Sequence, residues 1–240
     1  GDSLRLLEGF LTVFKNKLYF SATDGSSGNK ELWVFDGNTP PEIAADINPT
    51  GSSFPYELIV FNDKLYFNAR GPVDDFELWV YDGSSPPELV ANINLSSDSI
   101  PQNFAVFNDK LYFQATDGIN GNELWVYDGI FAPTGVANIN PDDGDSNPRD
   151  LTVFNNKLYF SADDGTSGRE LWVYDGSASP PEMVADINMG SGGSFPTHLT
   201  VFDGKLYFSV FLDGSDGELW VYDGTSPPAK VAEISPTGLF

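Results

Sequence analysis

The chain has no cysteine, one histidine (His198) and two methionines among its 240 residues. The absence of cysteine excludes disulfide bonds, thiolate metal sites and cysteine nucleophiles. No apolar run approaches the roughly 18 residues that a membrane-spanning helix requires. Basic residues are also scarce, because 12 Lys and Arg stand against 35 Asp and Glu and give a formal net charge of −23. An acidic protein repels phosphate groups and anionic lipid headgroups, so we expect no binding to nucleic acid or to a membrane surface. The lack of a long apolar run predicts no membrane insertion.

One unit occurs five times along the chain, and every copy contains the tripeptide Glu-Leu-Trp. The tryptophans of these copies recur at intervals of 46 to 48 residues, at Trp33, Trp79, Trp125, Trp172 and Trp220. A period of this length is typical of propeller blades and of other stacked arrays. The repeat therefore predicts the fold more directly than any single residue does.

Each unit reads as four short β-strands, because its apolar stretches are rich in Val, Tyr, Phe and Trp and are bounded by Gly, Pro, Asn and Asp. In the fourth unit the predicted strands are 151–154, 157–162, 170–175 and 181–187. Pairs such as Asn155-Asn156 suit a two-residue hairpin between the first and second strands. Asp-Gly followed by Pro-Pro separates the third strand from the fourth and indicates that the fourth is an edge strand.

Four strands repeated five times predict an all-β chain, a five-bladed β-propeller in one domain spanning residues 1–240. The expected blades are approximately 1–48, 49–94, 95–140, 141–188 and 189–240. The alternative is a β-solenoid, which normally repeats at a shorter period. The chain begins at a first strand and ends after a fourth. We therefore expect no strand exchange between the first and last blades, with packing alone closing the ring.

The segment Glu218-Leu219-Trp220-Val221-Tyr222-Asp223-Gly224-Thr225 resembles the signature of the ELWxxDGT repeat family of bacterial proteins. The other four units match this signature except at its last position, so the resemblance covers the whole chain. It implies a component of an extracellular or cell-surface protein and assigns no catalytic residue. In size and blade number the chain is also similar to five-bladed lectins of the tachylectin-2 type, although their sequence motif is absent.

Charge is unevenly distributed between the loops at the two ends of the predicted strands. The long loops and the termini hold 24 of the 35 acidic residues and five of the 12 basic ones, a net charge of −19. In a propeller these long loops emerge on one face, which we call the long-loop face. Its charge favours cations or basic partners.

Gly-rich loops with carboxylates suit Ca²⁺, which prefers oxygen ligands, and calcium is the one cofactor that the sequence suggests. The alternative is that these carboxylates solubilise the surface and cap turns. The candidate metal ligands are Asp24, Glu31, Asp117, Glu123, Asp164 and Glu170.

Residues that differ between units at the start of the innermost strand are the better candidates for binding a ligand. They are Tyr56, Glu57, Gln102, Asn103, Arg149, Asp150, Thr197 and His198. Phe54, Ile100 and Phe195 precede a proline beside them and could form shallow apolar floors or brace the loop. The repeated tryptophans could stack on sugars, but a position inside an apolar strand favours packing between blades.

A lone histidine and five copies of each carboxylate give little basis for one asymmetric active site, so we expect a binding module that is not an enzyme. The first hypothesis is a multivalent, lectin-like propeller that binds carbohydrate through the long-loop face. The second is a protein-interaction or adhesion scaffold that binds a basic protein surface, with or without bridging calcium. The third is self-assembly as a subunit of an extracellular structure.

Overall fold

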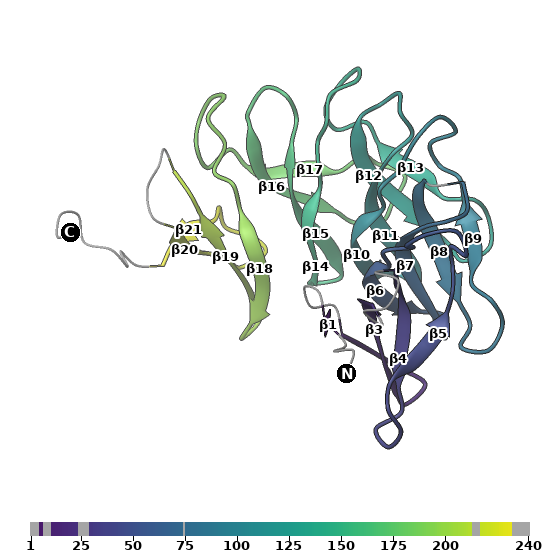
Figure 1. Ribbon diagram of the computed structural model, residues 1–240. Helices are drawn as coiled ribbons and strands as arrows, with labels where there is room; N and C mark the ends of the chain where they lie inside the picture. The colour runs from purple at the N-terminus through teal and green to yellow at the C-terminus, as the bar shows by residue number, and fades with distance from the viewer. Residues whose placement is uncertain (1–4, 7–10, 24–28, 74, 213–216, 232–240) are drawn as a thin grey trace, which may run out of the picture. The chain divides into compact units, whose positions relative to one another are not determined.

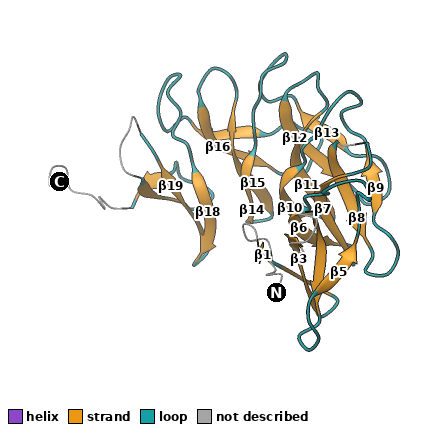
Figure 2. Cartoon of the chain, viewed as in Figure 1, coloured by secondary structure: helices purple, strands orange, loops and turns teal. Residues whose placement is uncertain are grey.

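The computed structural model describes residues 5–6, 11–23, 29–73, 75–212 and 217–231, and these form strands, turns and loops (Figures 1 and 2). Backbone contacts divide the chain into two compact units. We call residues 1–104, 115–118 and 127–133 the first unit, and residues 105–114, 119–126 and 134–240 the second unit. From here on, 'unit' means one of these two parts, and each of the five sequence repeats is called a blade. The described part of the chain holds no helix with the length and apolar character needed to span a lipid bilayer.

The strands form five antiparallel sheets, one for each sequence repeat. The first strands are β2 (Thr12–Phe14), β6 (Tyr56–Phe61), β10 (Gln102–Phe107), β14 (Arg149–Phe154) and β18 (Thr197–Phe202). The second strands are β3 (Lys17–Thr23), β7 (Lys64–Arg70), β11 (Lys110–Thr116), β15 (Lys157–Asp163) and β19 (Lys205–Val210). The third strands are β4 (Lys30–Phe35), β8 (Phe76–Tyr81), β12 (Asn122–Tyr127), β16 (Arg169–Tyr174) and β20 (Glu218–Tyr222). The fourth strands are β5 (Glu42–Ala45), β9 (Glu88–Ala91), β13 (Thr134–Ala137), β17 (Glu182–Ala185) and β21 (Ala229–Lys230).

The strand order within each sheet follows the sequence, as in β14-β15-β16-β17, which is the arrangement of a propeller blade. The first sheet carries an additional short strand, β1 (Arg5–Leu6), which pairs with β3. No described strand of the last repeat joins the first sheet. The chain is therefore an all-β, five-bladed β-propeller without strand exchange, as the sequence predicts. The assignment of all 240 residues to one domain stays a prediction.

Predicted and observed strand ends agree within a few residues in the fourth blade. The first strand begins at Arg149 rather than Leu151, and the fourth spans Glu182–Ala185 rather than 181–187. Both hairpin-turn residues, Asn155 and Asn156, have positive φ values of 47° and 55°. This left-handed conformation matches the right-handed twist of the flanking strands and explains the Asn and Asp pairs at these turns.

Neighbouring blades pack by a repeated contact that is present within each unit. In the first unit, Phe14 packs against Gly83 of the next blade, and Tyr19 contacts Tyr81 with ring centroids 6.0 Å apart. In the second unit, Phe154 packs against Gly224 in the same way. Gly224 has φ of +91°, and a Cβ there would lie 3.5 Å from the Phe154 ring. A larger residue would strain the turn, and its Cβ would lie only 2.8 Å from the Nδ2 of Asn155.

Candidate binding site

The glutamate of every Glu-Leu-Trp motif that can be compared is buried and holds the loop to the next blade. In the first blade, the Glu31 carboxylate accepts hydrogen bonds from the backbone N–H of Ile47 and from the N–H and hydroxyl of Ser53. Glu77, Glu123 and Glu170 repeat this arrangement with Ser99, Ser146 and Ser194. Burial raises the pKa of these carboxyls, and it raises that of Glu77 to about 6.

Four of the six residues predicted to bind calcium make hydrogen bonds within the protein. The carboxylates of Glu31, Glu123 and Glu170 face the protein interior, where backbone and serine donors occupy them. Asp164 caps its own loop by accepting the N–H groups of Thr166 at 2.8 Å and Ser167 at 2.7 Å.

No group of three or more acidic or histidine side chains suited to a metal occurs in the part of the chain that the structure describes. Asp117 is exposed to an intermediate degree, and Asp24 lies outside the described residues. Calcium binding stays a prediction. The hydrogen bonds that the carboxylates of Glu31, Glu123 and Glu170 make in the protein interior argue against direct coordination of calcium by these three residues.

The predicted ligand-binding residues are the first two residues of four inner strands, and the second of each pair adopts a left-handed backbone. The φ values are 53° for Glu57, 59° for Asn103, 56° for Asp150 and 57° for His198. Pairing is irregular at this point, since Tyr56 pairs with Asn68 whereas Ile59 is the next residue to pair. A β-bulge of this kind redirects side chains at a strand end.

Four of these eight residues belong to the first unit and four to the second. In the first unit, the Glu57 carboxylate is turned inward and accepts the N–H of Asn103, and burial raises its pKa. Tyr56 packs edge-on against Phe76, and its hydroxyl accepts a hydrogen bond from Asn68 at 2.6 Å. Gln102 is half-buried beside them.

In the second unit, the predicted residues lie at the start of β14 and β18. The Asp150 carbonyl accepts the hydroxyl of Thr152, and His198 is exposed with its Nδ1 3.1 Å from the Thr197 hydroxyl. Arg149 is exposed. Of the eight predicted residues, His198 and Arg149 are therefore the two most accessible to a ligand.

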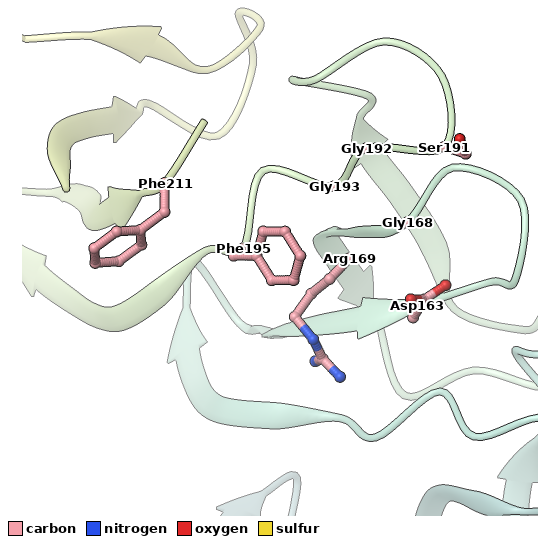
Figure 3. Close-up of a pocket in the computed structure, with 8 residues that line it drawn as sticks. All are labelled: Asp163, Gly168, Arg169, Ser191, Gly192, Gly193, Phe195 and Phe211. Atoms are coloured by element: carbon pink, nitrogen blue, oxygen red, sulfur yellow. The ribbon is translucent and has the colours of Figure 1, made fainter. Parts of the chain in front are cut away.

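A pocket of about 390 Å³ lies in the second unit, where the fourth blade leads into the fifth (Figure 3). It is lined by Asp163, Gly168, Arg169, Ser191, Gly192, Gly193, Phe195 and Phe211. Phe195 is 50% exposed and Phe211 is 40% exposed, so both rings present apolar surface to solvent. The polar residues of the lining are Asp163, Arg169 and Ser191, and the glycines of two loops complete it.

The pocket exists because this loop departs from its counterparts in the other blades. In three earlier blades a side chain accepts the first N–H of the third strand: Ser52 for Lys30, Asp98 for Phe76 and Asp145 for Asn122. In the fourth blade Gly193 lies against this N–H instead, and a Cβ at Gly193 would be 2.4 Å from the Arg169 nitrogen. The absence of a capping side chain leaves room for the pocket.

Loop length contributes to the same difference. The bracing serine follows its glutamate by 22 residues in the first two blades, by 23 in the third and by 24 in the fourth. The Asn188 side chain holds the lengthened loop by donating to the carbonyls of Gly192 at 2.7 Å and Gly193 at 3.1 Å. The backbone of the pocket is therefore preorganised.

The guanidinium of Arg169 is directed away from the glycine loop (Figure 3). It donates to the carbonyls of Asn147 at 2.8 Å, Ser161 at 3.1 Å and Ser146 at 3.4 Å. Burial lowers the pKa of this arginine and the neighbouring charge of Arg149 lowers it further, while the charges of Asp163 and Asp150 raise it. The positive charge of Arg169 therefore serves the scaffold, while its stem contributes to the pocket wall.

Sequence reasoning identified Phe195 as a possible apolar floor but missed Asp163, Ser191 and Phe211. The available signal was Gly190-Ser191-Gly192-Gly193, which is richer in glycine than the corresponding loops of the other repeats. The expected packing role of the tryptophans holds for Trp33 and Trp172, which are buried in core clusters, and for Trp79 and Trp220, which are partly buried and pack against such clusters. Trp125 is partly buried.

No protein-family model matches the sequence, and no curated protein sequence matches it. The resemblance to the ELWxxDGT family therefore gains no support from these comparisons. Solved structures match the fold. The chain is similar to the β-propeller domain of the Trilobed protease from Pyrococcus furiosus, with a TM-score of 0.58 and 15% identity over 98% of this chain and 71% of that one.

Two further similar structures are peptidases. A puromycin-hydrolyzing peptidase from Mycobacterium tuberculosis matches with a TM-score of 0.63 and 13% identity over 94% of this chain. Prolyl oligopeptidase B from Galerina marginata matches with a TM-score of 0.59 and 12% identity over 95% of this chain. The chain spans only 38% and 36% of their respective lengths.

These likenesses correct one prediction from the sequence. We predicted that the chain is not an enzyme, and the comparisons contradict this because the similar propellers belong to proteases and peptidases. A repeated, symmetric sequence was a poor basis for that prediction, since a propeller can form one part of an enzyme. At 12 to 15% identity, the likeness shows the fold alone: this chain is a β-propeller related in architecture to those of peptidases.

Proposed function

We propose that the chain binds carbohydrate in the pocket between Phe195 and Asp163, on its long-loop face. The observation that carries the proposal is the combination of two exposed aromatic rings with polar groups in one preorganised hollow. Aromatic faces pack against the apolar face of a pyranose ring, while carboxylate, hydroxyl and backbone groups hydrogen-bond to sugar hydroxyls.

The proposal changes the number of equivalent sites expected from the repeats. The repeats predicted multivalent binding, whereas the residues that correspond to Phe195 and its surroundings differ between the blades that can be compared. Phe54 lies under the ammonium of Lys30 in the first unit, and Ile100 replaces the aromatic ring in the next connection. We therefore place the principal carbohydrate site at the fourth connection, the loop that leads from the fourth blade to the fifth. Weaker binding at the other connections contributes avidity on a glycosylated surface.

A glycan array probed with the fluorescently labelled full chain tests this function. Wild-type protein should bind one saccharide class, and Phe195→Ala should reduce the apparent affinity about tenfold by removing the ring. Phe54→Ala is the matched control, because it removes the equivalent ring that Lys30 covers. A blank array, or equal binding by wild-type protein and Phe195→Ala, would overturn the proposal. Parallel slides with Ca²⁺ and with EDTA would reveal whether calcium takes part.

Charge supports a second candidate function, a protein-interaction or adhesion scaffold with a basic partner. The formal net charge of −23 gives the chain a strong preference for cationic surfaces. Such binding should weaken steeply as salt is raised, whereas the stacking of a neutral sugar should not. The resemblance to the ELWxxDGT family supports an extracellular or cell-surface location for either function. It also leaves room for self-assembly as the third hypothesis.

A further inference from the structure

The first blade shows what can bind an aromatic ring at the position that Phe195 occupies in the fourth connection between blades. Phe54 and Phe195 both precede a proline, with φ of 46° and 48°. Their N–H groups donate to the first residue of the preceding third strand, at 3.2 Å to Lys30 and 3.1 Å to Arg169. The Lys30 ammonium lies 4.9 Å from the centroid of the Phe54 ring. The first connection therefore places a cation over this ring.

The fourth connection has the same ring but lacks that internal cation. Arg169 occupies the position of Lys30, yet its guanidinium is held by the carbonyls of Asn147, Ser161 and Ser146. Phe195 is consequently 50% exposed, whereas Phe54 is half-buried under Lys30. A ligand could supply the cation that Lys30 supplies in the first blade.

The two charged residues of the pocket lining are held differently by the protein. Among the described residues that line the pocket, Asp163 is acidic and Arg169 is basic. The Asp163 carboxylate accepts the N–H of Gly165 at 2.7 Å, and it has no ion pair within 4 Å in the described part of the chain. The guanidinium of Arg169 is engaged by three carbonyl groups. A ligand ammonium would therefore be attracted by the Asp163 carboxylate, whereas a sugar carboxylate or sulfate would be repelled by that carboxylate.

We propose that the saccharide bound here is an amino sugar with a free, protonated amine, seated between the Phe195 ring and the Asp163 carboxylate. This inference rests on the proposed carbohydrate function and specifies its ligand. Acetylation would remove the charge that both groups recognise, so N-acetylated and neutral sugars should bind about 5- to 20-fold more weakly.

The test is calorimetric titration of the full chain with three tetrasaccharides at a pH that keeps the sugar amine protonated. The sugars are a glucosamine tetramer, its N-acetylated counterpart and a glucose tetramer. Asp163→Asn should weaken binding of the glucosamine tetramer several-fold and leave the other two unchanged. Asp186→Asn is the control, because Asp186 lies on the same loop and loses the same charge without lining the pocket. Circular dichroism confirms that the variants are folded.

The outcomes separate the two proposals. The inference is supported if the wild-type chain prefers the glucosamine tetramer, Asp163→Asn abolishes this preference and Asp186→Asn preserves it. Equal affinity for all three sugars overturns the inference and leaves the carbohydrate function standing. If no sugar binds, but a lysine tetrapeptide binds and Phe195→Ala abolishes that binding, both the carbohydrate function and the amino-sugar inference are overturned. The pocket is then assigned to basic peptides.

Discussion

The hydroxyl of Ser194 donates to the buried carboxylate of Glu170 across 24 residues of sequence, at 2.5 Å. The same carboxylate accepts the N–H of Ser194 at 2.8 Å and the N–H of Ile187 at 3.1 Å. One side chain thus holds both ends of the loop that forms the pocket. The order of this loop, and with it the position of Phe195, depends on this contact.

Replacing Ser194 by alanine should lower the free energy of unfolding by about 1 to 3 kcal/mol, because a buried carboxylate loses its hydroxyl donor. Ser191→Ala is the control, since Ser191 lies on the same loop but is exposed, and its effect should stay within about 0.5 kcal/mol. Urea denaturation at neutral pH measures both. Equal stability of the two variants would contradict the bracing role.

The raised pKa of Glu77 predicts a dependence of stability on pH. Its pKa rises from 4.5 to about 6 through burial, so the folded protein binds more protons than the unfolded chain between these values. The free energy of unfolding therefore falls as the pH rises through this window. The glutamine side chain in Glu77→Gln cannot ionise. Between pH 4.5 and 7 the free energy of unfolding of this variant should therefore decrease by about 1 kcal/mol less than that of the wild type.

Denaturation curves of wild-type protein and Glu77→Gln at several pH values measure this difference. Mutual repulsion of the acidic surface also declines toward low pH, but both proteins share that effect almost equally. Glu88→Gln controls for the lost charge, because Glu88 is an exposed glutamate on β9. Parallel profiles for Glu77→Gln and Glu88→Gln would disprove the assigned role of Glu77.

The sequence predicted the regular parts of the fold well, since these depend on local signals. Alternating turn and apolar segments located the four strands of each blade, and pairs such as Asn155-Asn156 located the hairpins. The role of Glu170 was missed because it depends on a serine 24 residues away, across a loop whose length varies. A glutamate that occurs in every repeat is better explained by this shared bracing contact than by calcium, which was our prediction for three of the five.

The pocket was beyond the reach of repeat analysis for a related reason. It combines what one repeat lacks, a side chain at Gly193, with the exposed rings of Phe195 and Phe211. Residues shared by all repeats describe the blade, whereas this feature belongs to one connection. Comparison of the loops with one another, rather than with a consensus, would have singled out Gly192-Gly193.

Introducing a side chain at Gly193 should damage both stability and the pocket. A Cβ would lie 2.4 Å from the Arg169 nitrogen, which belongs to a paired strand and cannot move freely. Gly193→Ala should therefore lower the free energy of unfolding by about 1 to 3 kcal/mol. Gly135→Ala has nothing within 4 Å of its new Cβ and should be neutral or slightly stabilising. Thermal denaturation compares the two, and equal melting temperatures would contradict the predicted clash.

Arg169→Lys tests whether the scaffold role of the guanidinium keeps the Phe195 ring open to a ligand. An ammonium cannot reproduce the planar donor set that reaches three carbonyls, so stability should fall by about 1 to 2 kcal/mol. The released lysine should take the position that Lys30 takes over Phe54 and compete with an amine ligand, weakening its binding several-fold. Arg149→Lys changes an exposed arginine nearby and should leave both quantities unchanged. Wild-type stability and affinity in Arg169→Lys would show that the guanidinium contacts are dispensable.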